Sequence, residues 1–174
     1  MKYIDEMPYF LREVYSNTKW DKTQFPSWLK EGELPSCIVR DLRADDNALS
    51  LWEIHDDKSN LPHVIVALAC RRKSVKNDFD YALLDENHLD KLIFKPTKKT
   101  AKTSYRDMNP YHCDVPNLSI NTVVYFAYLL SRHGKFDRMG WKDIETRLKD
   151  AYKRGQLDLA KMEPKLKQQL GLSE

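Results

Sequence analysis

Apolar and polar residues alternate along the middle of this chain in the manner of strands. Residues 48–55 and 79–84 each place apolar side chains at every second position, a pattern typical of half-buried strands. The run 64–70 is apolar on both alternating faces, which predicts a central strand covered on both sides. With residues 37–42, which precede a polar turn, these segments predict an antiparallel sheet of about four strands.

The last third of the chain has helical spacing and residues that begin and end helices. We expect a helix over residues 120–133, with Asn117 or Ser119 as its N-cap and Gly134 at its end. Further helices are expected over residues 141–154 and from Pro164 to Gly171.

Two short segments near the N-terminus, residues 8–15 and 26–30, start at a proline suited to a first helical turn and are expected to form short helices that cap the sheet. The chain is therefore interpreted as one α+β domain, with C-terminal helices packed on one face of the sheet. Its expected parts are a helical cap (1–35), a β-meander (36–94), a basic loop (95–117) and a helical part (118–174).

Composition narrows the class of protein. A length of 174 residues fits one domain, and three isolated cysteines without metal-ligand spacing favour a reduced cytoplasm without disulfides or a metal site. Acidic residues at positions 5 and 6 interrupt any secretory signal, and the most apolar stretch, 120–130, is too short to cross a membrane. No glycine-rich phosphate loop or nucleophile elbow is present, so no cofactor is expected.

Charge is distributed unevenly along the chain. Residues 1–60 carry 8 basic and 12 acidic side chains, whereas residues 91–174 carry 17 basic and 9 acidic ones. This asymmetry predicts an acidic protein or a nucleic acid as partner. The candidate contact residues are the basic side chains of three segments and one tyrosine for stacking: Arg71, Arg72, Lys98, Lys99, Lys102, Tyr105, Lys142, Lys149 and Lys153.

A histidine in the basic loop offers a catalytic alternative. His112 as general acid and base, with Arg106 and Lys102 to hold a phosphate, would suffice for a metal-independent ribonuclease. The spacing from Arg106 to His112 is similar to the active-site motif of the HEPN ribonucleases. That family is all-helical, and Pro110 interrupts the helix that the motif requires.

Three other arrangements of chemical groups are weaker. His55, Asp56, Asp57 and His63 flank the expected hairpin and could hold a metal, although the same residues are ordinary in turns. A magnesium nuclease would use carboxylates on successive strands, but the lysine expected after Glu53 is missing; the carboxylates are Asp41, Glu53, Asp78 and Asp80. The sequence His112-Cys113-Asp114 contains a thiol, but adjacent residues rarely converge in a nucleophilic site.

These patterns favour a small non-catalytic intracellular binding protein of the adaptor, inhibitor, immunity or antitoxin type. Its basic C-terminal half would engage an acidic protein or a nucleic acid. The alternative is a toxin-type ribonuclease that uses His112 with Arg106. The sequence leaves the oligomeric state open.

Overall fold

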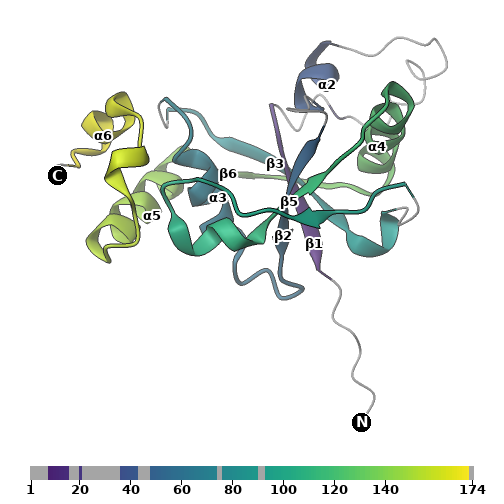
Figure 1. Ribbon diagram of the computed structural model, residues 1–174. Coiled ribbons are helices and arrows are strands. Elements are labelled where there is room, and N and C mark those ends of the chain that lie inside the picture. Colours follow the sequence, from purple (N-terminus) through teal and green to yellow (C-terminus); the bar gives the residue numbers. More distant parts are fainter. Residues whose placement is uncertain are drawn as a thin grey trace.

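A single antiparallel sheet forms the centre of the protein (Figure 1). The structure is a computed structural model that describes residues 8–15, 20, 36–42, 48–73, 76–89 and 93–172. Within these residues the sheet has six strands in the order β4-β5-β2-β1-β3-β6. The strands are β1 (Tyr9–Val14), β2 (Leu49–Ile54), β3 (Phe79–Asp85), β4 (Thr97–Lys98), β5 (His112–Val115) and β6 (Lys135–Met139).

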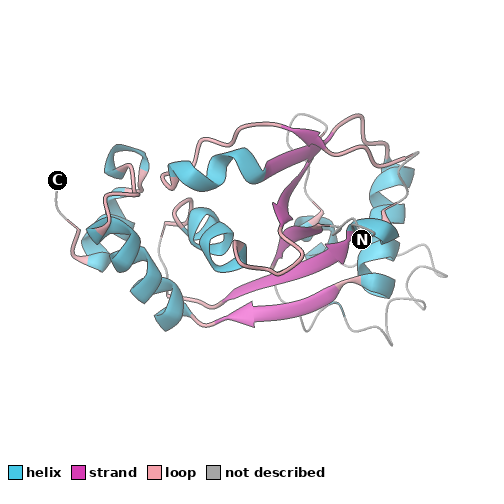
Figure 2. Cartoon of the chain, turned by 90° about the horizontal axis from the view of Figure 1, so that it is seen from below, coloured by secondary structure: helices cyan, strands magenta, loops and turns pink. Residues whose placement is uncertain are grey.

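Helices cover both faces of this sheet. They are α2 (Ser36–Asp41), α3 (Leu61–Ala69), α4 (Ile120–His133), α5 (Trp141–Lys153) and α6 (Pro164–Leu170). Short 3-10 segments occur at Glu86–His88, Arg106–Tyr111 and Leu159–Lys161. Figures 1 and 2 show α4 on the opposite side of the sheet from α3 and α5.

The strand alternation divides the core into two layers. Leu11 and Ile54 point to the face that packs against α3, α5 and α6, where Leu148 is fully buried. Phe10 and Leu51 point to the other face, where α2 and α4 supply the facing side chains. The expected α+β class with one antiparallel sheet is confirmed, while the strand number of about four is corrected to six and the helices lie on both faces.

The most apolar segment of the middle region is a helix and not a strand. Residues 64–70 were expected to form the central strand, but they belong to α3 and its C-cap. Every side chain from Val64 to Cys70 is buried, and a continuous apolar run has no periodicity that separates a strand from a buried helix. Pro62 in the first turn of α3 and Asn60 at its N-cap are the local signs of a helix.

Two other segments have the opposite secondary structure to the one expected, a strand in place of a helix and a helix in place of a strand. Residues 8–15, expected as a helix, contain β1, which pairs with both β2 and β3. Residues 37–42, expected as a strand, lie largely in α2. The expected loop 95–117 contains β4, a 3-10 segment and β5, and strand β6 was not expected. The expected helix at 26–30 lies outside the described residues.

The C-terminal helices follow the sequence pattern closely. Helix α4 begins at a capping box in which the backbone N–H of Thr122 donates to Ser119 Oγ and the backbone N–H of Ser119 donates to Thr122 Oγ1. Helix α6 ends at Gly171, whose φ of 66° lies in the left-handed region. None of the helices in the described residues is long and apolar enough to span a membrane.

Candidate functional site

A large cleft of about 1310 Å³ lies at one end of the sheet. The C-terminal ends of β1, β5 and β6 meet the N-terminal ends of β2 and β3 at this end, because all neighbouring strands are antiparallel. The cleft is lined by side chains from these strand ends, by the residues that follow α3, by α2 and by residues 99–103. It therefore gathers residues that are far apart in the sequence.

The cleft walls are rich in charge. Eight basic and five acidic residues line it among the described residues, a formal excess of three positive charges. The acidic residues are Glu13, Asp41, Asp78, Asp80 and Asp114. The partners of these carboxylates decide how much of the positive charge remains for a ligand.

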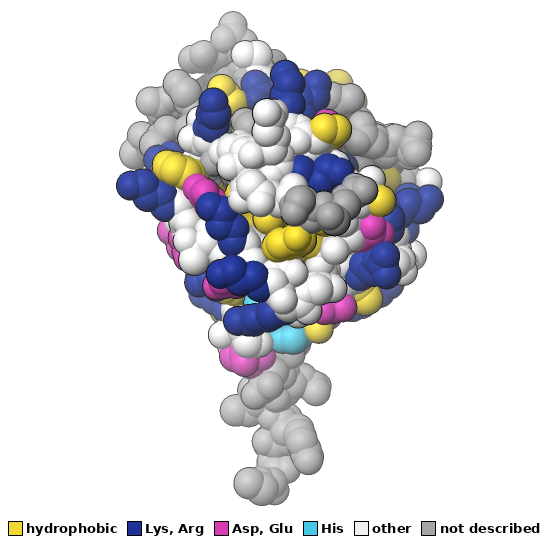
Figure 3. Space-filling view, turned by 90° about the vertical axis from the view of Figure 1, so that its left-hand side faces the viewer, with side chains coloured by type: hydrophobic (Ala, Val, Ile, Leu, Met, Phe, Trp, Pro, Cys, Tyr) yellow, Lys and Arg dark blue, Asp and Glu magenta, His cyan; other side chains and the backbone are white. Residues whose placement is uncertain are grey.

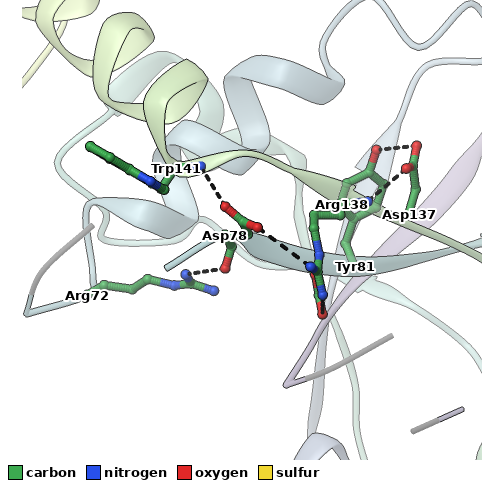
Figure 4. Close-up of polar contacts among 7 residues, drawn as sticks. Arg72, Asp78, Tyr81, Asp137, Arg138 and Trp141 are labelled. Atoms are coloured by element: carbon green, nitrogen blue, oxygen red, sulfur yellow. Dashed lines mark hydrogen bonds and ion pairs between the residues drawn. The ribbon is translucent and has the colours of Figure 1, made fainter. Parts of the chain in front are cut away.

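Arg138 neutralises two of the carboxylates at the junction of β3 and β6. Its guanidinium donates from Nε to Asp80 Oδ1 at 2.6 Å and from Nη2 to Asp80 Oδ2 at 3.0 Å, while Nη1 lies 3.6 Å from Asp78 Oδ2. Asp78 also accepts the backbone N–H of Trp141 at 3.0 Å, at the start of α5 (Figure 4). These contacts fix the wall from which α5 begins.

Arg72 has a similar structural role on the next part of the wall. Its guanidinium donates to Glu13 Oε1 at 2.6 Å, lies over the ring of Phe79 and donates to the backbone carbonyl of Asp78. Figure 4 shows Arg72 and Arg138 approaching Asp78 from opposite sides. Both arginines are therefore engaged in holding the cleft together.

The remaining two carboxylates also have partners. Asp41 accepts hydrogen bonds from the indole N–H of Trp20 at 2.8 Å and from the backbone N–H of Tyr15, and burial raises the pKa of its carboxyl above the ordinary value. Asp114 pairs with Lys99 at 3.0 Å. All five acidic side chains of the cleft thus already contact a donor or a cation.

Three cations of the cleft have no side-chain ion pair, hydrogen bond or ring contact within the described residues, whereas Arg40, which also pairs with no carboxylate there, lies over the ring of Tyr15. Arg71, Lys76 and Lys102 are exposed and come from the end of α3, the segment before β3 and the segment before the buried Thr103. Two aromatic side chains line the same cleft: Tyr15, which is 61% exposed and carries Arg40 over its ring, and the half-buried Trp141. Free cations beside accessible aromatic rings suit an anionic ligand with planar groups.

A hydroxyl and an imidazole meet in the same cleft. Ser50 Oγ lies 2.6 Å from Nε2 of His112, whose Nδ1 lies 2.7 Å from the carbonyl oxygen of Lys99. Asp114 Oδ1 is 3.4 Å from Nε2, and Trp52 contacts the imidazole edge-on at 5.2 Å between ring centroids. His112 is 9% exposed, so the ring is held inside the wall.

The sequence-predicted contact residues separate into two groups. Arg71, Arg72, Lys99 and Lys102 line the cleft together with His112. Tyr105, expected to stack on a ligand, is 2% exposed, packs in the core and has its hydroxyl 3.1 Å from Nδ1 of His63.

The other predicted residues lie elsewhere. Arg106 and Lys98 form ion pairs with Asp158 and Glu53 and do not line the cleft. Lys142, Lys149 and Lys153 lie on α5, where Lys149 pairs with Glu145. Figure 3 views the end of the molecule that carries α5 and α6, where basic side chains are spread over the face and acidic ones lie among some of them. The structure thus brings His112 together with Lys102 but not with Arg106.

The alternative sites from the sequence are not assembled in the described residues. His55 contacts Ser59 and Tyr111, whereas His63 contacts Tyr105, so the two imidazoles have separate partners. No cluster of three or more potential metal ligands occurs within the part of the chain that the structure describes. Cys113 is 2% exposed, and burial raises the pKa of its thiol to about 11, which suits a core residue.

Sequence reasoning missed Ser50, Lys76 and Trp141 as cleft residues. One sign was present for Ser50, because it shares its strand face with the apolar Trp52 and Ile54, where a polar residue is unexpected.

Comparisons with family models, with curated proteins and with solved structures find no match. Function is therefore inferred from the cleft itself.

Proposed function

We propose that this protein is a small cytoplasmic binding protein whose ligand is a single-stranded nucleic acid, held in the cleft at the end of the sheet. The observation that carries the proposal is the set of three exposed cleft cations, Arg71, Lys76 and Lys102, whose side chains have no ion pair, hydrogen bond or ring contact within the described residues. The five acidic cleft residues already have partners. A strand with regularly spaced phosphates would neutralise the remaining charge.

The shape and the aromatic side chains favour a single strand over a duplex. Duplex readout requires a helix or ribbon that protrudes into a groove, whereas these cations line a recess. Tyr15 and Trp141 offer rings on which unpaired bases can stack. An acidic protein segment, the other partner expected from the sequence, would use the cations but not the rings.

The alternative of a metal-independent ribonuclease that uses His112 with Arg106 receives less support. The guanidinium of Arg106 lies 2.9 Å from Asp158 Oδ2, outside the cleft that His112 lines. A phosphate held by Arg106 would therefore not reach the imidazole without a rearrangement of this ion pair.

Fluorescence anisotropy with short labelled strands tests the proposal. We expect single-stranded RNA or DNA to bind more tightly than a duplex of the same sequence or an acidic peptide of equal charge. The variant Arg71→Ala/Lys76→Ala/Lys102→Ala should bind weakly. The control Lys149→Ala/Lys153→Ala/Lys165→Ala removes the same charge from α5 and α6, outside the cleft, and should bind like the wild type. Equal losses in the two variants would contradict the proposal.

A further inference from the structure

The hydrogen bonds around His112 determine which nitrogen carries its proton. The carbonyl oxygen of Lys99 can only accept, so Nδ1 of the neutral imidazole must donate to it across the 2.7 Å contact. Nε2 then presents its lone pair, and the Ser50 hydroxyl donates to it at 2.6 Å. A hydroxyl donating to an oriented imidazole is the arrangement that activates a serine as a nucleophile.

The sheet register holds this pair in place. Ser50 lies opposite Asp114, and His112 lies opposite Trp52, so Ser50 and His112 are diagonal neighbours on one face of the β2–β5 pair. The edge contact with Trp52 orients the ring plane. When the imidazole gains a proton, the carboxylate of Asp114, 3.4 Å from Nε2, faces the new charge.

We propose that Ser50 and His112 form a nucleophile–base pair that cleaves phosphodiester bonds of the strand held in the cleft. The choice of substrate rests on the proposed function, because the cleft cations are what would bring a phosphate to Ser50. Lys102 and Arg71 line the same cleft and would stabilise the charge on the phosphoryl oxygens during attack. The pair itself is defined by geometry that does not depend on the ligand.

The proposed reaction has two balanced steps. In the first, Ser50 Oγ attacks phosphorus while its proton passes to Nε2 of His112, and the Oγ–P bond forms. The bond from phosphorus to one sugar oxygen breaks, and that oxygen takes the proton from Nε2. In the second, water attacks the phosphoserine diester, gives its proton to Nε2 and releases Ser50, which regains a proton from the imidazole. The net reaction is hydrolysis of one P–O bond.

A second hydroxyl–imidazole contact provides an internal control. Ser59 Oγ lies 3.0 Å from Nδ1 of His55, in an exposed turn that does not line the cleft. If proximity of a serine and a histidine were sufficient, both serines would react. Both imidazoles have a carboxylate nearby, Asp114 for His112 and Asp57 for His55. Of these two serines, Ser50 alone combines a tautomer fixed by a backbone carbonyl with free cations in the same cleft.

The first test is covalent labelling with a fluorophosphonate, in which a serine oxygen displaces fluoride from phosphorus. Intact mass and peptide mapping should place one adduct on Ser50 and none on Ser59. His112→Gln should slow labelling by about 10²-fold or more, with thermal unfolding confirming that the variant is folded, whereas Ser59→Ala should leave the rate unchanged. No adduct on Ser50, or an adduct that forms equally fast in His112→Gln, would overturn the proposal.

The second test uses labelled single-stranded DNA and RNA in excess chelator. Attack by Ser50 needs no 2′-hydroxyl, so both strands should be cut and Ser50→Ala should lose about 10²-fold or more of the rate on each. Cleavage of RNA alone, or cleavage that survives Ser50→Ala, would exclude Ser50 as nucleophile. Wild-type protein that binds strands without cutting or labelling would refute this inference while leaving the binding function intact; labelling of Ser50 without strand binding would refute the proposed substrate.

Discussion

Arg138 holds both carboxylate oxygens of Asp80, with Nε to Oδ1 at 2.6 Å and Nη2 to Oδ2 at 3.0 Å. The two residues are direct partners in the β3–β6 register, and Asp80 is 5% exposed whereas half of the Arg138 side chain faces solvent. A two-point contact of this kind fixes orientation as well as distance. It therefore fastens the edge strand β6 to β3 at the point where α5 begins.

Loss of this contact is expected to destabilise the fold. Arg138→Ala removes the bidentate partner of a buried carboxylate, and Arg138→Lys restores charge but not the two-point geometry. We expect the urea midpoint to fall most in Arg138→Ala and by an intermediate amount in Arg138→Lys. The control Arg147→Ala breaks an exposed i,i+4 pair with Asp143 on α5 and should leave the midpoint nearly unchanged. Equal midpoints for Arg138→Ala and Arg147→Ala would show that the contact adds no stability.

A close backbone approach requires glycine after α4. A Cβ at Gly134 would lie 2.3 Å from the carbonyl oxygen of Leu130, whereas a Cβ at Gly140 would meet no heavy atom within 4 Å. Gly134→Ala must therefore displace the backbone and should cost about 1 to 3 kcal/mol of unfolding free energy. Gly140→Ala should cost less than about 1 kcal/mol, as expected for alanine at an N-cap. Denaturant unfolding of the two variants compares the same chemical change at a closed and an open position.

Burial of two thiols predicts loss of stability at alkaline pH. Desolvation raises the pKa of Cys70 from 9.0 to about 12 and that of Cys113 to about 11. Above pH 9 the unfolded chain loses these protons while the native state keeps them, so the unfolded state binds fewer protons and stability falls as pH rises. The slope is roughly 1.4 kcal/mol per pH unit for each proton that differs.

Substitution of each thiol should flatten this decline over a different range. Cys70→Ala should reduce the slope of unfolding free energy between about pH 9 and 12, and Cys113→Ala between about pH 9 and 11. Each variant loses some packing at neutral pH, so the comparison is of slopes and not of absolute values. Parallel pH profiles for wild type and Cys70→Ala would show that the buried thiol does not titrate in this window.

Local signals in the sequence accounted for the C-terminal helices but not for the sheet order or the cleft. Ser119 and Gly134 lie at the ends of α4, where capping chemistry acts over a few residues. Strand β1 was mistaken for a helix because Pro8 suits a first turn, whereas its structure is decided by pairing with β2 and β3. Tertiary pairing overrode the local preference.

The candidate site required contacts across long sequence separations. Ser50 and His112 are 62 residues apart and meet only because β2 and β5 are neighbours in the sheet. The sequence marks His112 as a chemical group and places Arg106 near it, but it carries no sign that Ser50 is the side chain in contact with the imidazole. The sequence identifies Arg71 and Lys102 as candidate contact residues from their charge alone. The structure adds that nearby carboxylates are already paired with other cations, Glu13 with Arg72 and Asp114 with Lys99.

If a single strand occupies the cleft as proposed, the salt dependence of its binding gives the number of phosphate contacts. Each cation that neutralises a phosphate of a single strand contributes about 0.7 to the slope of log binding constant against log salt concentration. Removal of Arg71, Lys76 and Lys102 together should therefore flatten the slope by about 2, if each meets one phosphate. Anisotropy titrations at several salt concentrations measure this slope for wild type, for the cleft variant and for Lys149→Ala/Lys153→Ala/Lys165→Ala. The last variant tests whether α5, which the sequence also suggested, contacts the strand. A flatter slope in that variant, together with an unchanged slope in the cleft variant, would show that the strand binds the C-terminal helices and not the cleft.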